Sequence, residues 1–412
     1  MSWYEAAAYA EFKGKSLPTL FHWNRAADTS ASSFVIPLSN FGRGPAPVGS
    51  HRGLSSYGVY DMAGNVKEWC RNEAAGGRRY ILGGGWGEPY YMFNDVDAQP
   101  PMARAPAFGF RTVKYLAPLP DSSPLKAAIA PSHREYERER PISDATFRVY
   151  KSLFSYDSTD LGAVVEEVDS NEEHWRRERV TYQLPHEMDR MTAFLYLPRD
   201  FSPPYQAVIY FPGSDAIYQK SSKALQEDMF DFIVRSGRAV ICPLYQGTYE
   251  RGGSLRSDYP NTTNVYRDHV IQWSRELGVT IDYLETRSDI RPGRIGYYGL
   301  SWGAALGAIF PAVEKRFKVS VLHGGGFYLQ KALSEVDQIN FASRVTLPTL
   351  MLNGRYDFFY PVEGSQKPMF KLLGTPAKDK EYVLFDSGHI VPRNEMVRRT
   401  LEWLDRYLGS VK

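Results

Sequence analysis

The segment from Arg294 to Gly307 constrains the fold of this chain more than any other stretch. Its residues predict a short apolar strand, a very tight turn at Ser301 and then a helix of small residues. Ser301 lies within a Gly-x-Ser-x-Gly sequence, and a serine on such a turn points its hydroxyl clear of the backbone. A side chain at Gly299 or Gly303 would collide with the neighbouring strand or helix. We therefore expect Ser301 to be the centre of a nucleophilic site.

Residues 146–412 alternate between strand-like and helix-like patterns. Closely spaced β-rich runs predict antiparallel strands at 147–150, 163–168, 179–183 and 192–197. Further strands are expected at 207–211, 239–242, 295–298, 319–322, 349–352 and 382–385, and helices at 223–236, 264–285 and 394–408. Antiparallel strands that lead into βαβ units form a doubly wound, mostly parallel α/β sheet. Together with a serine on a tight turn, this pattern favours the α/β-hydrolase fold.

In the α/β-hydrolase fold, an acidic residue and then a histidine follow the nucleophilic serine along the chain. Beyond Ser301 the sequence holds only two histidines, His323 and His389. His323 ends the strand directly after the serine, so it comes too early to follow the acid. His389 lies in a loop just past the last predicted strand, where side chains face the ligand crevice. We expect His389 to take the proton of Ser301 as a general base.

The acidic residue should lie on the loop after the penultimate strand. Asp357 lies on that loop, and we expect it to orient the His389 imidazole and to stabilise its protonated form. Asp337 precedes the strand and Asp386 is too near His389 in sequence, so both are weaker candidates. The alternative role for Asp357 is that of a turn cap.

Two backbone N–H groups should face the negative charge that develops on the substrate oxygen. The residue after the nucleophile, Trp302, is expected to supply one of them. The loop after the strand at 207–211 should supply the other; many hydrolases carry His-Gly-x there, and this chain has Pro212-Gly213-Ser214. Because proline has no N–H, we assign the second donor to Ser214, with Gly213 as the next choice.

Three aromatic residues near these motifs, Tyr245, Tyr249 and Trp302, are candidates for lining the substrate pocket. The two tyrosines lie just past the strand at 239–242, in a loop that should overhang the crevice. Packing in the core is an equal alternative for all three rings.

Residues 146–412 resemble the serine hydrolases near dienelactone hydrolase, acetyl xylan esterase and the prolyl oligopeptidase catalytic domain. Dienelactone hydrolase usually carries a cysteine as its nucleophile, so Ser301 favours an esterase. The resemblance implies a serine carboxylic ester hydrolase that acts through an acyl-enzyme on small or short-chain esters, without a catalytic cofactor. One alternative is a prolyl-oligopeptidase-like serine peptidase, although no propeller domain precedes the catalytic part. The other is a non-catalytic binding or scaffold protein.

Residues 1–115 follow a different pattern, rich in glycine and aromatic residues. A capping box formed by Ser2 and Glu5 predicts a helix through Phe12. Four stretches resemble the sulfatase-modifying-factor family: residues 2–6, 14–19, 58–69 and 109–111. The resemblance implies the small, irregular α+β fold of the formylglycine-generating enzyme, which is of the C-type-lectin-like kind. It covers about the C-terminal half of such a domain, so we expect the chain to be a fragment of a longer protein.

Active members of this family use a pair of cysteines before the final Gly-Phe-Arg, but this chain has none between Gly83 and Arg111. Without the thiols there is no copper site, so we expect a structural or binding role for the domain. The family often holds a structural calcium, for which Asn65 and Glu68 could supply oxygen ligands. The alternative is that Glu68 pairs with a neighbouring arginine or caps a turn, and we assign no metal.

The remaining features concern the setting of the two domains. A Pro- and Ser-rich stretch predicts a linker over residues 116–145. The net charge of +2 argues against nucleic-acid binding, and no apolar run is long enough for a membrane span. Two distant cysteines, Cys70 and Cys242, favour a reducing, cytoplasmic location over a disulfide framework. The expected partners are a small-molecule ester and, through the domain at 1–115, a second copy of the chain. Domains of these two kinds also occur together in bacterial protein-kinase-linked proteins, and this chain carries no kinase motif.

Overall fold

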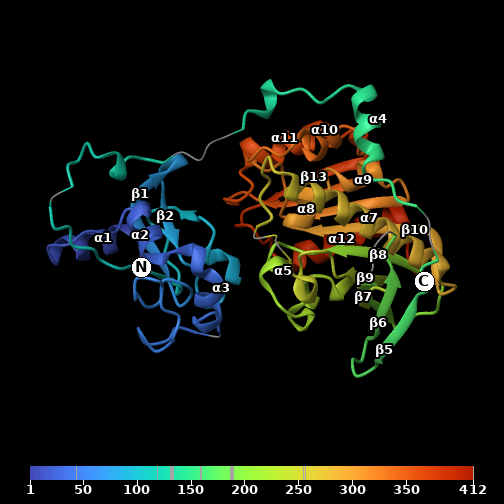
Figure 1. Cartoon of the computed structure of the whole chain (residues 1–412), viewed down its shortest axis with the longest axis horizontal. Helices are drawn as coiled ribbons and strands as arrows, with labels where there is room; N and C mark the ends of the chain where they lie inside the picture. The colour runs from blue at the N-terminus through green and yellow to red at the C-terminus, as the bar shows by residue number, and fades with distance from the viewer. Residues whose placement is uncertain are drawn as a thin grey trace. The chain divides into compact units, whose positions relative to one another are not determined.

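The computed structural model describes residues 1–42, 44–117, 119–129, 134–157, 160–185, 190–253, 255 and 257–411. The contacts divide the chain into two compact units, Met1–His133 and Arg134–Lys412 (Figure 1). This division falls inside the stretch 116–145 that was expected to be a linker. Pro118 and residues 130–133 of that stretch lie outside the described residues.

The described part of the first unit is a small α+β structure, as predicted, built on a four-stranded sheet in the order β3-β2-β1-β4. Its strands are β1 (Lys67–Ala74), β2 (Arg78–Leu82), β3 (Ala98–Gln99) and β4 (Phe108–Gly109). Its helices are α1 (Trp3–Phe12), α2 (Leu20–Ala27) and α3 (Ser32–Val35). The predicted capping box begins α1: the Ser2 hydroxyl accepts from the Glu5 N–H, and the Glu5 carboxylate accepts from the Ser2 N–H at 2.7 Å.

The two side chains considered as calcium ligands are both engaged with protein donors. The Glu68 carboxylate accepts from the Trp23 indole and from the Arg111 guanidinium, each at 2.8 Å. The Asn65 side-chain oxygen accepts from the Asn40 amide at 3.1 Å and from the Ala46 N–H at 2.9 Å. In the part of the chain that the structure describes, no group of three or more His, Cys, Asp and Glu side chains is arranged to hold a metal ion.

In the described part of the second unit, a nine-stranded mixed sheet has the order β13-β12-β11-β10-β8-β9-β7-β6-β5. The strands from β8 to β13 pair in parallel with one another. By contrast, β5, β6 and β7 pair antiparallel, including β7 with β9, and form one end of the sheet, green in Figure 1. The strands are β5 (Val164–Asp169), β6 (Trp175–Gln183), β7 (Arg190–Pro198), β8 (Tyr205–Phe211), β9 (Ala239–Pro243), β10 (Ile290–Leu300), β11 (Phe317–His323), β12 (Thr349–Gly354) and β13 (Lys380–Phe385).

Helices cover both faces of this sheet. They are α4 (Asp144–Ser152), α5 (Asp215–Tyr218), α6 (Asp231–Arg235), α7 (Asn264–Thr286), α8 (Trp302–Leu306), α9 (Phe310–Val313), α10 (Ile339–Ala342), α11 (Lys367–Leu372) and α12 (Arg393–Leu408). Successive strand residues enter opposite cores: Ile209 and Tyr297 pack with α7 and α8, whereas Tyr210 and Tyr298 pack with α6 and α12. Burial on both faces explains the nearly continuous apolar runs of the central strands. The predicted doubly wound, mostly parallel sheet is confirmed.

Two predicted elements of the second unit are wrong. Residues 147–150 lie in α4 and not in a strand, because the Ser143 hydroxyl caps the Thr146 N–H and Phe147 packs on Phe341. The helix expected over 223–236 is reduced to α6 and short turns. Phe230, just before α6, has a non-helical backbone and packs its ring within 5.1 Å of the Tyr196 ring, so tertiary packing overrides the local helical pattern.

Both cysteines are free and buried, Cys70 in β1 and Cys242 in β9. Burial raises the pKa of each thiol well above its usual value, so neither is a ready nucleophile. None of the helices that the structure describes combines the length and the apolar character needed to cross a bilayer.

Candidate active site

Ser301 occupies a sharp turn between β10 and α8, with φ 51° and ψ −104°. Such a backbone conformation is strained for a residue with a side chain. The two flanking glycines make the turn sterically feasible. A Cβ on Gly299 would lie 2.4 Å from the carbonyl oxygen of Gly303, and a Cβ on Gly303 would lie 2.4 Å from the carbonyl oxygen of Phe211. The turn therefore brings α8 directly against the end of β8.

We expect Gly303→Ala to destabilise the second unit by about 1–3 kcal/mol, because the added methyl group would displace the backbone of β8. The midpoint of urea unfolding should fall accordingly. Gly388→Ala is the matched control, since a Cβ there meets no heavy atom within 4 Å. Equal unfolding midpoints for the two variants would show that the close approach at Gly303 is not as tight as described.

A continuous chain of hydrogen bonds joins Ser301, His389 and Asp357. His389 Nε2 lies 2.8 Å from Ser301 Oγ, and His389 Nδ1 lies 2.8 Å from Asp357 Oδ2. The other oxygen of Asp357, Oδ1, accepts from the N–H groups of Phe359 at 2.9 Å and Tyr360 at 3.2 Å. The Asp357 side chain is fully buried, whereas the His389 side chain is 11% exposed. Of the three side chains predicted from motif order, Ser301 and Asp357 thus each lie within hydrogen-bond distance of His389.

The loops that carry Asp357 and His389 are fixed to each other beyond the ends of β12 and β13. The Tyr356 N–H donates to the carbonyl oxygen of Ser387 at 2.9 Å, which extends the pairing of the two strands. Gly354 permits this approach, since a Cβ there would lie 1.7 Å from the carbonyl oxygen of Gly388. The acid and the imidazole are therefore held on two loops whose backbones are hydrogen-bonded to each other.

The loop 212–214 lies directly beside Ser301. The Gly303 N–H donates to the carbonyl oxygen of Pro212 at 3.1 Å, and a Cβ on Gly213 would lie 3.6 Å from Ser301 Cβ. Ser214 is the N-cap of α5 and Trp302 is the first residue of α8, positions whose N–H groups have no partner within their own helix. Both N–H groups predicted as oxyanion donors therefore lie at helix starts in the two segments that meet at Ser301.

The three aromatic rings considered for the substrate pocket are buried. The Tyr245 ring stacks on Phe211 with centroids 4.1 Å apart. The Trp302 indole meets the rings of Phe211 and Trp273 edge-on at 4.8 and 4.7 Å. Tyr249 is 4% exposed. Their surroundings correspond to the core-packing alternative. Trp302 therefore contributes to the site through its backbone N–H and not through its indole ring.

The weaker acidic candidates pair with arginines instead of the imidazole. Asp337 contacts Arg134 at 2.9 Å, and Asp386 contacts Arg355 at 2.7 Å. The second histidine, His323, is fully buried at the end of β11. Burial, together with the nearby His389, lowers its pKa to about 3, so His323 is neutral across the physiological range.

Three residues that the sequence did not single out also surround the site. Tyr360 stacks on the His389 ring with centroids 6.0 Å apart and planes at 24°. Asp215 directly follows Ser214, and burial raises the pKa of its carboxyl to about 6. Asp258 is a buried carboxyl in the loop between β9 and α7. Tyr360 could have been found from its spacing after Asp357, which is that of an Asx turn, but no local pattern points to Asp258.

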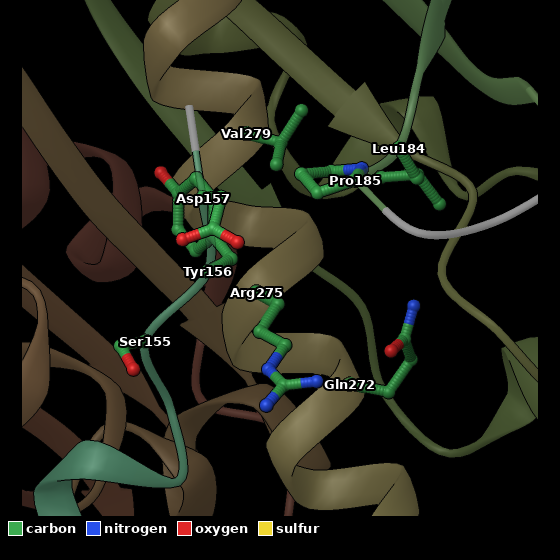
Figure 2. Close-up of a pocket in the computed structure, with 8 residues that line it drawn as sticks. All are labelled: Ser155, Tyr156, Asp157, Leu184, Pro185, Gln272, Arg275 and Val279. Carbon is green, nitrogen blue, oxygen red and sulfur yellow. The ribbon is translucent and has the colours of Figure 1, made fainter. Parts of the chain in front are cut away.

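A cavity of about 370 Å³ lies along α7 (Figure 2). Its walls come from α7 and from the segments at 155–157 and 184–185, and Arg275 and Gln272 extend from the helix beside it. Its eight lining residues include neither Ser301 nor His389, so we do not assign it to the reaction at Ser301.

Comparisons with known proteins agree with this architecture. Residues 1–116 match the sulfatase-modifying factor enzyme 1-like domain family. The serine/threonine-protein kinase pkn1 of Chlamydia pneumoniae is 36% identical over 80 residues, which are 18% of this chain and only 13% of the kinase. Bacillus subtilis "Putative hydrolase YtaP" is 24% identical over 258 residues, which cover 52% of this chain and 84% of that protein.

Among solved structures, the acetyl xylan esterase of Paenibacillus sp. R4 matches with a TM-score of 0.51 and 16% identity, covering 66% of this chain and 98% of the esterase. The chain joins a sulfatase-modifying-factor-like domain to a domain with the α/β-hydrolase fold. The fold expected for the hydrolase domain and the resemblance of the first domain are both confirmed.

Proposed function

We propose that the hydrolase domain is a serine carboxylic ester hydrolase that acts on small or short-chain esters through an acyl-enzyme. One observation carries the proposal: Ser301 lies on the strained turn with its hydroxyl 2.8 Å from His389 Nε2, whose other nitrogen lies 2.8 Å from the buried Asp357. A serine hydroxyl becomes an effective nucleophile when a positioned base takes its proton.

In the first half-reaction, Ser301 Oγ attacks the ester carbonyl carbon while His389 Nε2 takes the hydroxyl proton. The negative charge moves to the carbonyl oxygen, which accepts from the N–H groups of Trp302 and Ser214. The bond to the alcohol oxygen then breaks, and His389 gives its proton to the leaving alcohol. Asp357 keeps the proton on Nδ1, so that Nε2 is free to accept, and its charge stabilises the imidazolium.

In the second half-reaction, water attacks the acyl-serine carbonyl while His389 again takes a proton. The second tetrahedral species collapses to the carboxylic acid and free Ser301, which regains its proton from His389. No cofactor takes part in either half of this scheme. YtaP is named a putative hydrolase, and the Paenibacillus enzyme is named an acetyl xylan esterase. These two names support a carboxylic ester as the substrate class.

We assign a non-catalytic role to the sulfatase-modifying-factor-like domain. It has no cysteine between Gly83 and Arg111, and its Cys70 thiol is buried with a raised pKa. The thiol chemistry of the active family members therefore has no counterpart in this domain.

Labelling with a fluorophosphonate tests the function directly. We expect the probe to add to the peptide that contains Ser301, and p-nitrophenyl acetate to be hydrolysed until the probe has reacted. Ser387→Ala, which removes the hydroxyl of another serine near His389, should label and turn over as the wild type does. A protein that is neither labelled at Ser301 nor active on short-chain p-nitrophenyl esters would contradict the proposal.

A further inference from the structure

His323 is a buried imidazole beside the proposed triad, and the scheme above does not use it. It ends β11, the strand that pairs with β10 up to the residue before Ser301, and it is fully buried. A buried imidazole is unfavourable unless its ring nitrogens are hydrogen-bonded. The hydrogen-bond partners of His323 lie in the two segments that carry Ser301 and His389.

The backbone at the end of β11 lies against both residues between which the proton moves. The Ser301 N–H donates to the carbonyl oxygen of His323 at 2.8 Å. The next residue, Gly324, is close to the general base, since a Cβ there would lie 2.9 Å from the carbonyl oxygen of His389. The nucleophile and the base are therefore both packed on residues 323–324.

The imidazole of His323 binds the segment that follows His389. Val391, two residues after His389, donates its N–H to His323 Nε2 at 3.4 Å. Because a backbone N–H can only donate, Nε2 must be the acceptor, and the ring proton of the neutral imidazole must lie on Nδ1. That proton faces the Tyr298 hydroxyl at 3.5 Å, and the hydroxyl donates onward to Met396 Sδ at 3.6 Å.

Tyr298 and Met396 connect His323 to the two elements that border the site. Tyr298 lies on β10, three residues before Ser301, and Met396 lies in the first turn of α12, just after the His389 loop. Both side chains are buried. His323 thus joins the strand that presents the nucleophile to the segment that presents the base.

We propose that His323 is a positioning residue for ester hydrolysis, which as the neutral Nδ1–H tautomer holds the His389 loop in register with Ser301. This inference rests on the proposed function. Proton transfer needs the 2.8 Å approach of Ser301 Oγ to His389 Nε2, and a displacement of about 1 Å can lower a rate about a hundredfold. If Nε2 of His323 carried the proton instead, it would meet the Val391 N–H donor to donor and release the loop.

The test compares two amides at position 323 of the full chain. His323→Gln places an amide oxygen near the Nε2 position, where it can accept from the Val391 N–H. His323→Asn is one methylene shorter and reaches only the Nδ1 position, so the Val391 N–H loses its acceptor. On p-nitrophenyl acetate we expect kcat to fall about tenfold or more in His323→Asn and to stay within about threefold of the wild type in His323→Gln. KM should change less than about threefold in both variants.

Ser320→Ala is the matched control, because Ser320 is also fully buried in β11 and its hydroxyl meets no partner among the described residues. Its kcat should equal that of the wild type. End-point labelling with a fluorophosphonate separates positioning from misfolding, since Ser301 of His323→Asn should label completely but more slowly. Equal kcat values for the two amide variants, or incomplete labelling that accounts for the whole loss, would overturn the inference.

A measurement on the wild type decides the matter if His323→Asn does not fold. NMR of the full chain with isotope-labelled histidine reports which ring nitrogen carries the proton, and we expect it on Nδ1 of His323 at neutral pH. A proton on Nε2 would overturn the inference. Ser301→Ala is assayed in parallel: its loss of turnover keeps the proposed function intact, whereas full turnover would overturn the function itself.

Discussion

Ser301→Ala is expected to lower kcat for p-nitrophenyl acetate by a factor on the order of 10⁴ or more, as in other enzymes that lose a nucleophilic serine. The reason is chemical, because alanine has no oxygen to form the acyl-enzyme. The N–H groups of Trp302 and Ser214 would still bind the substrate oxygen, so a small residual rate above that of water is expected. Initial rates at several enzyme concentrations measure the change.

The fold of this variant should be intact, since the substitution removes only one oxygen and keeps the backbone hydrogen bonds of residue 301 to His323 and Ala305. An unchanged urea midpoint would show this, and fluorophosphonate labelling should disappear together with turnover. Retention of more than about a hundredth of the wild-type rate, after contaminating esterases have been excluded, would show that another group attacks the ester.

Asp357→Asn is expected to lower kcat by about 10⁴, the effect seen when asparagine replaces the acid of such a triad. The geometry explains the size of the effect. Oδ1 accepts from the N–H groups of Phe359 and Tyr360, so the asparagine oxygen should take that position. The amide NH₂ would then face His389 Nδ1 and donate to it. The imidazole would be forced to carry its proton on Nε2, where it cannot accept the proton of Ser301.

Asp386→Asn is the matched control for this variant, because it neutralises an exposed aspartate on the His389 loop that is paired with Arg355. Its kcat should stay within about twofold of the wild type, as expected for a screened surface pair. Equal losses in both variants would show that the overall charge of these loops matters and not the tautomer of His389.

The order of the motifs along the chain located Ser301, Asp357 and His389, which the structure joins by hydrogen bonds. The parallel strands could be predicted because both of their faces are buried, which gives continuous apolar runs. The side chains just past their ends could be placed at one edge of the sheet because parallel strands run in the same direction. Glycine at 299 and 303 was informative because the turn leaves no room for a Cβ. These features are local in sequence, or depend only on the order of elements.

The features that sequence reasoning missed depend on packing between distant segments. Phe147, Val149 and Tyr150 suit a strand, and the Ser143 cap together with the contact of Phe147 with Phe341 shows why residues 147–150 form a helix. Asp258 has no pattern around it, since its partner Tyr328 lies far away in the chain. The burial of Trp302 between rings of two other elements likewise could not be read from its place in the motif.

The burial of both native thiols makes the folded protein inert toward reagents that attack thiolates. Cys70 and Cys242 are at most 1% exposed. A single cysteine introduced at an exposed position, such as Glu11 in α1 or Glu402 in α12, would therefore react selectively with a maleimide dye. Fluorescent reporters can thus be attached to either domain without first replacing the native cysteines.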